Sequence, residues 1–191
     1  MLDTIAWYTP FFITVSLIFV AWRYSDWKTW RKYYPTILFI SVVSLLTYIL
    51  TIDYPLWLYN ESFLFPNRMM HELRLIFFIF PALILIFLTF YPNTAVMLRQ
   101  LAYIFIWVII CSIFESFLVF IKIITYHNGW NFPWSVVVWF IMFSVIAIHQ
   151  KKPIWMWVIC TIFSVVVINY FNIPFAKWLK WLIYFDHFFV H

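Results

Sequence analysis

The feature of this 191-residue sequence that most limits its fold is a series of long apolar stretches separated by charged residues. A helix that crosses about 30 Å of hydrocarbon, at about 1.5 Å per residue, needs about 20 mostly apolar residues. Six stretches meet or approach this length, so the sequence predicts six transmembrane helices. Their expected ranges are 4–22, 33–52, 68–91, 100–121, 133–148 and 154–172.

The composition excludes most other classes of protein. Hydrophobic residues make up 66% of the chain and charged residues 10%, whereas soluble domains average about 45–50% and ~25%. The single glycine, Gly129, excludes Gly-rich phosphate loops and dinucleotide-binding motifs. The sequence therefore predicts an all-α polytopic helix bundle, with one transmembrane domain over residues 1–174.

The segment 175–191 has a different pattern. After Pro174, four polar residues recur at spacings of three and four and form one narrow stripe on a helix: Lys177, Lys180, Tyr184 and His187. Mainly apolar and aromatic residues cover the other faces, a pattern typical of a helix that lies in the membrane interface. Packing of this segment onto the other helices is the alternative. The expected interface anchors are Lys177, Trp178, Lys180 and Trp181.

The basic residues predict the orientation. The first, third and fifth loops carry seven Lys and Arg residues, and the opposite face carries five. By the positive-inside rule, these odd loops are cytoplasmic and both termini lie outside a plasma membrane. The net charge of +5 is then a property of the membrane surfaces and gives no reason to expect nucleic acid as a partner.

Two ionisable residues fall well inside the predicted spans. Charged side chains at the centre of a bilayer cost about 2.5–3.5 kcal/mol on insertion scales, so such residues are functional-site hypotheses. Glu115 lies roughly 10 Å below the even-loop face by helical rise, and Arg74 is about as deep. Because their helices are consecutive and antiparallel, the two side chains could form a buried ion pair. Alternatively, Glu115 binds a cation or relays a proton.

Other polar residues gather at the same face. They predict a polar vestibule that opens to the outer side, with Glu115 and Arg74 as its floor. The candidate residues for a ligand or ion pathway are Glu115, Arg74, Glu72, His71, Asn67, His127 and Asn131.

No catalytic motif is complete. His71-Glu72 begins like the zinc signature HExxH, but Leu75 occupies the position of the second histidine. Folding could still bring His71 and Glu72 together with Glu115 and His127 around a metal, but no metal site and no cofactor are predicted.

Two local features of the backbone are also predicted. Pro81 lies inside the third span, where it should kink the helix and free the carbonyl near Phe77. Asn128-Gly129 suits a tight turn with positive φ. Alternatively, the segment around this turn is a re-entrant loop whose side chains line the vestibule.

Several aromatic-rich strings give the chain a resemblance to a known family. They are Asp26-Trp27, Trp30-Arg31-Lys32-Tyr33-Tyr34-Pro35-Thr36, Asp53-Tyr54-Pro55-Leu56-Trp57, Pro66-Asn67, Tyr91-Pro92, Ile124-Thr125-Tyr126-His127-Asn128-Gly129-Trp130-Asn131, His149 and Lys151-Lys152-Pro153. Over about residues 20–174 the chain resembles a family of small multi-pass membrane proteins of endospore-forming, Bacillus-type bacteria. That family has no established activity, so the resemblance implies location and architecture and supplies no catalytic residues.

The sequence thus favours a non-enzymatic membrane protein. Its polar vestibule would serve the binding or passage of a small solute or ion, or the assembly of a membrane complex. Besides the lipid bilayer, the partners left open are such a solute or ion, another membrane protein and a second copy of the chain. The alternative is a membrane-embedded enzyme that acts on a lipid or isoprenoid, with Glu115 or His71 as the acid–base group.

Overall fold

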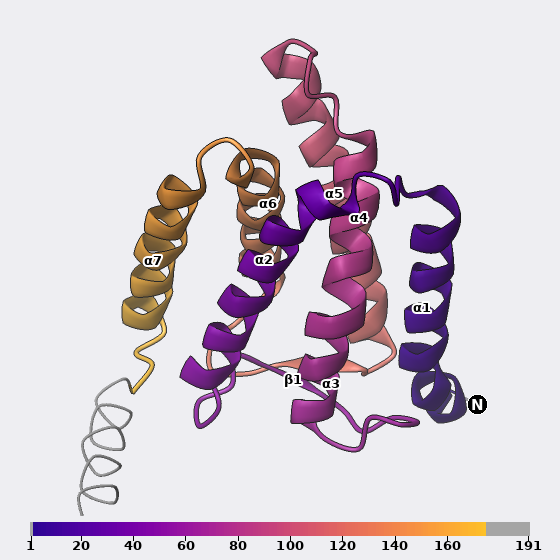
Figure 1. The fold of residues 1–191 in the computed structure, drawn as a ribbon. Helices are drawn as coiled ribbons and strands as arrows, with labels where there is room; N and C mark the ends of the chain where they lie inside the picture. Colours follow the sequence, from indigo (N-terminus) through magenta and orange to yellow (C-terminus); the bar gives the residue numbers. More distant parts are fainter. Residues whose placement is uncertain (1, 175–191) are drawn as a thin grey trace, which may run out of the picture.

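The computed structural model describes residues 2–174. The predicted interfacial helix and its anchors, Lys177, Trp178, Lys180 and Trp181, lie outside the described residues. Within them, six helical segments are long and apolar enough to cross a membrane (Figure 1). Five are single α-helices: α1 (Leu2–Tyr24), α2 (Trp30–Leu50), α5 (Met97–Phe120), α6 (Phe132–His149) and α7 (Pro153–Tyr170). The remaining span is composite, with α3 (Arg68–Arg74), η1 (Leu75–Ile79) and α4 (Phe80–Phe90).

The predicted all-α bundle is confirmed, and each predicted span matches one helical segment. The largest shifts are three residues: the second helix begins at Trp30 and the fourth at Met97. Both shifts add charged residues to a first turn, including Arg31, Lys32 and Arg99, and all three are exposed at the odd-loop end. The charged residues mark where the apolar part of a span begins, but the helix itself starts a few residues earlier.

The third span contains a π-helical segment instead of a simple kink. The N–H of Phe80 donates to the carbonyl of Leu75, five residues back. At this spacing the missing N–H of Pro81 leaves the carbonyl of Ile76 without its helical partner, next to Phe77, near which a freed carbonyl was expected. The hydroxyl of Ser41 donates to Ile76 O at 3.4 Å, so α2 supplies the replacement.

A two-stranded antiparallel ribbon was not predicted. Strand β1 (Trp57–Tyr59) pairs with β2 (Ile124–Tyr126), with Trp57 opposite Tyr126 and Tyr59 opposite Ile124. In Figure 1 the ribbon crosses the end of the bundle at which α1 begins and α7 ends. It therefore joins the second and fourth loops into a cover over the even-loop end.

The Asn128-Gly129 turn is confirmed. Both residues have positive φ, +52° and +84°, and the N–H of Trp130 donates to His127 O at 3.0 Å. Two successive positive φ values inside such a turn define type I′, for which Asn-Gly is a preferred sequence. The side chain of Asn128 also donates to Pro55 O at 2.7 Å and fixes the turn beside the ribbon.

The middle of the bundle is a dry aromatic and aliphatic core. Its fully buried side chains come from α4 and α6: Ile84, Phe87, Phe143 and Ile146. The rings of Phe87 and Phe143 lie 5.0 Å apart between centroids. Around this core the outer helix faces stay exposed and apolar, as expected of surfaces that contact lipid.

Gly129→Ala should lower the free energy of unfolding by about 1–2 kcal/mol, the cost of a left-handed conformation for a residue with a Cβ. The added Cβ would lie 3.8 Å from Phe171, an ordinary contact, so the backbone alone accounts for the loss. Reversible unfolding of the purified protein in detergent measures it. Thr94→Ala, in an exposed loop, is the control, and an unchanged stability of Gly129→Ala would contradict the argument.

Candidate functional site

The polar residues of α3 form the most buried ionisable cluster among the described residues. The helix begins at the cap residue Asn67, whose Oδ1 accepts from the N–H of Met70 at 3.0 Å. From this start, α3 carries Arg68, His71, Glu72 and Arg74 beneath the ribbon. The last three are buried, and Arg68 is half-buried. We call these four residues, together with Tyr59 and Ser62, the α3 site.

His71 is fully enclosed. Its Nε2 lies 3.3 Å from Ser62 Oγ, and its ring stacks on Tyr59 with centroids 5.1 Å apart and planes 13° from parallel. Its Nδ1 has no hydrogen-bond partner among the described residues. His71 is thus held by the ribbon side of the site, while one ring nitrogen remains unbonded.

Arg68 ties α3 to the end of α2. Its guanidinium donates to Thr51 O at 2.8 Å and to Thr51 Oγ1 at 2.9 Å, and it lies over the ring of Tyr48. The carbonyls at a helix C-terminus lack intrahelical donors and carry partial negative charge, so a cation stabilises them. Arg68 Nε has no hydrogen-bond partner among residues 2–174.

Arg74 ties the same helix to α1. Its guanidinium donates to Pro10 O at 3.3 Å and to Thr14 Oγ1 at 3.2 Å, and it lies over the ring of Phe65. Within the described part of the chain, its Nε is also buried and unbonded. Helix α3 is therefore bonded to two other spans, to α2 through Arg68 and to α1 through Arg74.

The positive charges of Arg68 and Arg74 act on both Glu72 and Tyr59. Burial, followed by the negative charge of Glu72, raises the pKa of the Tyr59 phenol, and the charge of Arg74 opposes this shift. Tyr59 therefore stays protonated at neutral pH. The Glu72 side chain is 6% exposed and accepts no hydrogen bond from the described residues. Its carboxylate oxygens are not among the fully enclosed unbonded atoms, so they still reach the surface.

Glu115 belongs to a separate polar cluster. Its two carboxylate oxygens accept from the hydroxyl of Tyr126 at 2.7 Å and from the indole N–H of Trp139 at 2.6 Å. Ser135 continues the network: it donates to the Tyr126 oxygen at 3.4 Å and accepts from Trp130 Nε1 at 3.0 Å. Glu115 thereby joins α5, the ribbon and α6.

The predicted Glu115–Arg74 ion pair is wrong. Arg74 turns toward α1, whereas α5 packs chiefly along α6 and carries Glu115 to that side. Consecutive, antiparallel order in the chain allowed the pair, but α5 has α6 as its main neighbour. The two residues therefore bond to different partners, although the charges of both act on Tyr59.

The remaining candidates lie at the surface of the same end. Asn131 Oδ1 accepts from the N–H of Trp134 at 3.4 Å and caps α6, as Asn67 caps α3. His127 Nε2 lies 3.0 Å from Thr125 Oγ1. Asn67, Asn131 and His127 are all exposed. The two asparagines cap helices and His127 contacts a residue of β2, so each of these side chains bonds only to residues close to it in the chain.

Sequence reasoning missed most of the partners that define these clusters. Tyr59 and Ser62 reach His71 from a loop, and Thr14 reaches Arg74 from the first span. A similar contact at the other end was also missed: Thr36 Oγ1 lies 3.0 Å from Nδ1 of the buried His149. A threonine inside an apolar helix is the sequence signal that could have indicated these partners. Thr14 bonds to the guanidinium of Arg74, and Thr36 bonds to a ring nitrogen of His149.

Among residues 2–174, no group of three His, Cys, Asp or Glu side chains is arranged so that it could hold a metal ion. No family model matches this chain, and neither a curated protein nor a solved structure matches it. The function is therefore argued from the site.

Tyr126→Phe should lower the free energy of unfolding by about 1.5–3 kcal/mol, the range for a hydrogen bond to a charged group. In a Glu115→Gln background the same change should cost about 0.5–1.5 kcal/mol, because the acceptor is then neutral. Reversible unfolding in detergent gives both values.

Tyr170→Phe, which alters an exposed ring on α7, is the matched control and should leave the stability unchanged. Equal costs of Tyr126→Phe in the two backgrounds would show that the charge of Glu115 does not strengthen this bond.

Proposed function

We propose that this integral membrane protein binds a small polar solute or ion at the α3 site. The observation that carries the proposal is a set of three buried nitrogens without hydrogen-bond partners among the described residues: Arg68 Nε, His71 Nδ1 and Arg74 Nε. Roughly 90% or more of buried polar groups in proteins are bonded, and an unbonded one costs about 1–3 kcal/mol. Three on one seven-residue helix, beside the unbonded carboxylate of Glu72, favour a site that a ligand completes.

The position of the site supports this role. The half-buried Arg68 lies at the outer surface of the bundle, while His71 and Arg74 lie deeper along α3. The π-helical segment η1 follows Arg74 directly, and π-helical turns are frequent at functional sites. A small solute would therefore enter beside the start of α3, under the ribbon.

The core favours binding over passage. Below the α3 site, Ile84, Phe87, Phe143 and Ile146 are fully buried and fill the middle of the bundle. The next buried polar contact, between Thr36 and His149, lies at the opposite end. A transport path through one chain would need polar groups along its length, and these side chains offer none.

The hydrogen bonds of Glu115 and His71 favour binding over the enzymatic alternative. Both oxygens of Glu115 accept from donors of the chain itself, Tyr126 and Trp139. His71 faces Ser62 and Tyr59 instead. The acid–base group of an enzyme must be free to face its substrate, and both oxygens of Glu115 are already engaged.

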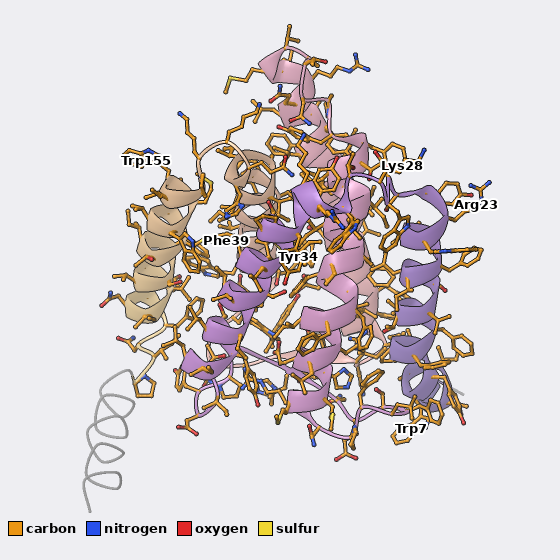
Figure 2. All side chains as sticks on the ribbon, in the orientation of Figure 1. Trp7, Arg23, Lys28, Tyr34, Phe39 and Trp155 are labelled. Carbon is orange, nitrogen blue, oxygen red and sulfur yellow. The ribbon has the colours of Figure 1, made fainter. Side chains whose placement is uncertain are left out.

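We further propose that the odd loops are cytoplasmic, in the plasma membrane of a Bacillus-type bacterium. The aromatic-rich strings in the loops resemble a family found in such bacteria, and this resemblance supports a Bacillus-type bacterium as the source of the protein. The orientation draws added support from the side chains, because all seven odd-loop Lys and Arg residues are exposed, as for Arg23 and Lys28 in Figure 2. On the opposite face Arg68 and Arg74 are engaged within the bundle, which leaves Lys122 as the exposed basic residue of the described part.

This orientation predicts opposite labelling of two single-cysteine variants made after Cys111 and Cys160 are replaced by serine. Glu61→Cys, in the second loop, should react with a membrane-impermeant maleimide in intact cells. Asn93→Cys, in the third loop, should react only after permeabilisation. Both positions are exposed, and the reverse pattern would invert the topology.

For binding, small probes at constant ionic strength should raise the Tm of the purified full chain by mass action. The probes are chloride, phosphate, acetate, potassium and glycine. We expect at least one to raise the Tm of the wild type, each variant being measured against its own unliganded Tm. The shift from an anion should be reduced in Arg74→Lys, which lacks the Nε donor, and the shift from potassium or glycine should be reduced in Glu72→Gln. Arg99→Gln, at the opposite end, is the control and should keep the full shift.

The binding proposal fails if no probe raises the Tm, or if both Glu72→Gln and Arg74→Lys keep the full shift. Flux of the binding probe into vesicles that contain the protein, above that of protein-free vesicles, would instead show passage.

A further inference from the structure

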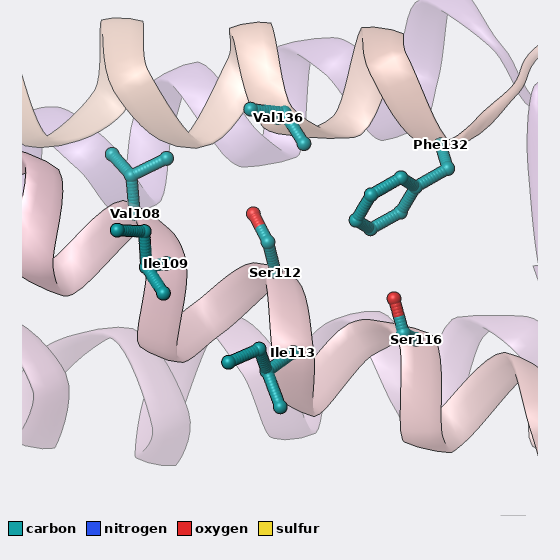
Figure 3. A pocket seen from close by; sticks show the side chains of 7 residues that line it. All are labelled: Val108, Ile109, Ser112, Ile113, Ser116, Phe132 and Val136. Atoms are coloured by element: carbon teal, nitrogen blue, oxygen red, sulfur yellow. The ribbon is translucent and has the colours of Figure 1, made fainter.

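A narrow slot runs along the groove between α5 and α6, apart from the α3 site. Its volume is about 320 Å³. It is lined on α5 by Val108, Ile109, Ser112, Ile113 and Ser116, and on α6 by Phe132 and Val136 (Figure 3). We call it the lateral slot.

The lateral slot opens toward the bilayer. Ile109 and Ile113, at its edge, are 55% and 66% exposed on a helix long and apolar enough to span the membrane. On a spanning helix such exposed apolar side chains contact lipid. Glu115, on the same helix, bonds to Tyr126 and Trp139 and does not line the slot.

The slot has one polar end and one apolar end. Its α5 residues recur every fourth position from Val108 to Ser116, a length of about 12 Å by helical rise. The serines lie toward the even-loop end of α5, and Val108 lies toward mid-membrane. The slot therefore follows the helix axis, in the direction of lipid chains, with its hydroxyls on the side of the nearer headgroups.

Ser112 supplies an unused hydrogen-bond donor. The residue is only 7% exposed, and its Oγ is buried without a partner among the described residues. Figure 3 shows this oxygen directed into the slot toward α6. A hydroxyl in the interior of a helix commonly bonds to the carbonyl four residues back, but that of Ser112 makes no such bond.

We propose that the lateral slot binds one acyl chain of a bilayer glycerolipid, whose ester carbonyl accepts a hydrogen bond from Ser112. The volume lies at the lower end of the range for ligand pockets, about 300–1,000 Å³, which suits a single chain. The chain would lie along Ser112 and Val108, between the two helices, and its ester would face the serine end. This site does not depend on the α3 site.

Photolabelling tests the proposal. The full chain is placed in vesicles of phosphatidylethanolamine and phosphatidylglycerol with a trace of phosphatidylglycerol that carries a diazirine in its acyl chain. We expect residues 108–116 and 132–136 to be labelled more heavily than residues 158–166 of the lipid-facing helix α7. Ser112→Leu, which fills the slot, should remove this excess, whereas the control Ser164→Leu on α7 should keep it.

The ester is tested with an ether-linked probe of the same chain length. In the wild type the ether probe should label the slot about two- to tenfold less, the effect of one hydrogen bond. In Ser112→Ala, which keeps the space but lacks the donor, the two probes should label equally. If Ser112→Leu does not fold, Val136→Phe fills the slot from α6.

Three results would overturn the proposal: equal labelling of the slot and of α7, labelling unchanged by both slot-filling variants, or equal labelling of the wild type by the ester and ether probes. Cross-linking of residues 109–113 to a second copy of the chain, in place of lipid, would assign the slot to an oligomer contact and also reject it.

Discussion

Hydrocarbon offers no hydrogen-bond partners, and the arrangement of this bundle depends on how its few polar side chains meet that constraint. Arg68 donates to the end of α2, and Arg74 donates to Pro10 and Thr14 of α1. Glu115 joins α5 to α6 through Trp139. These three charged groups inside the spans thus each bond two elements together, and the ribbon covers the end where these bonds gather.

The same constraint separates the polar end from the rest of the molecule. Large apolar side chains fill the middle, and the outer helix faces remain available to lipid. Unbonded buried groups are then informative, because they stand out against a chain whose other polar groups are mostly bonded. Among the described residues, Ser25 and Gln150 carry such atoms in or beside the odd loops. Within the spans these atoms occur at the α3 site, in an enclosed polar setting, and at Ser112, in an apolar slot. The two places call for ligands of different chemistry.

The fold was largely predictable because its main signals are local. An uncharged apolar stretch reports a span wherever it occurs, and Asn128-Gly129 reports a turn from two neighbouring residues. The ribbon was not predictable, since three-residue strands 67 positions apart in the chain leave no comparable local signal. The freed carbonyl, that of Ile76, lies near Phe77 as expected, but the sequence did not reveal that the helix before Pro81 would widen to π spacing.

The sequence by itself determined the class of the protein, the number of spans, and the residues that must find polar partners in lipid, Arg74 and Glu115 among them. These follow from transfer free energies that act residue by residue. Only the tertiary structure decided the partners, because helices of similar hydropathy can pack in several orders. Packing placed α6 beside α5, and α1 beside η1 and α4, and thereby gave Glu115 an indole and a phenol, and Arg74 a proline carbonyl and a threonine.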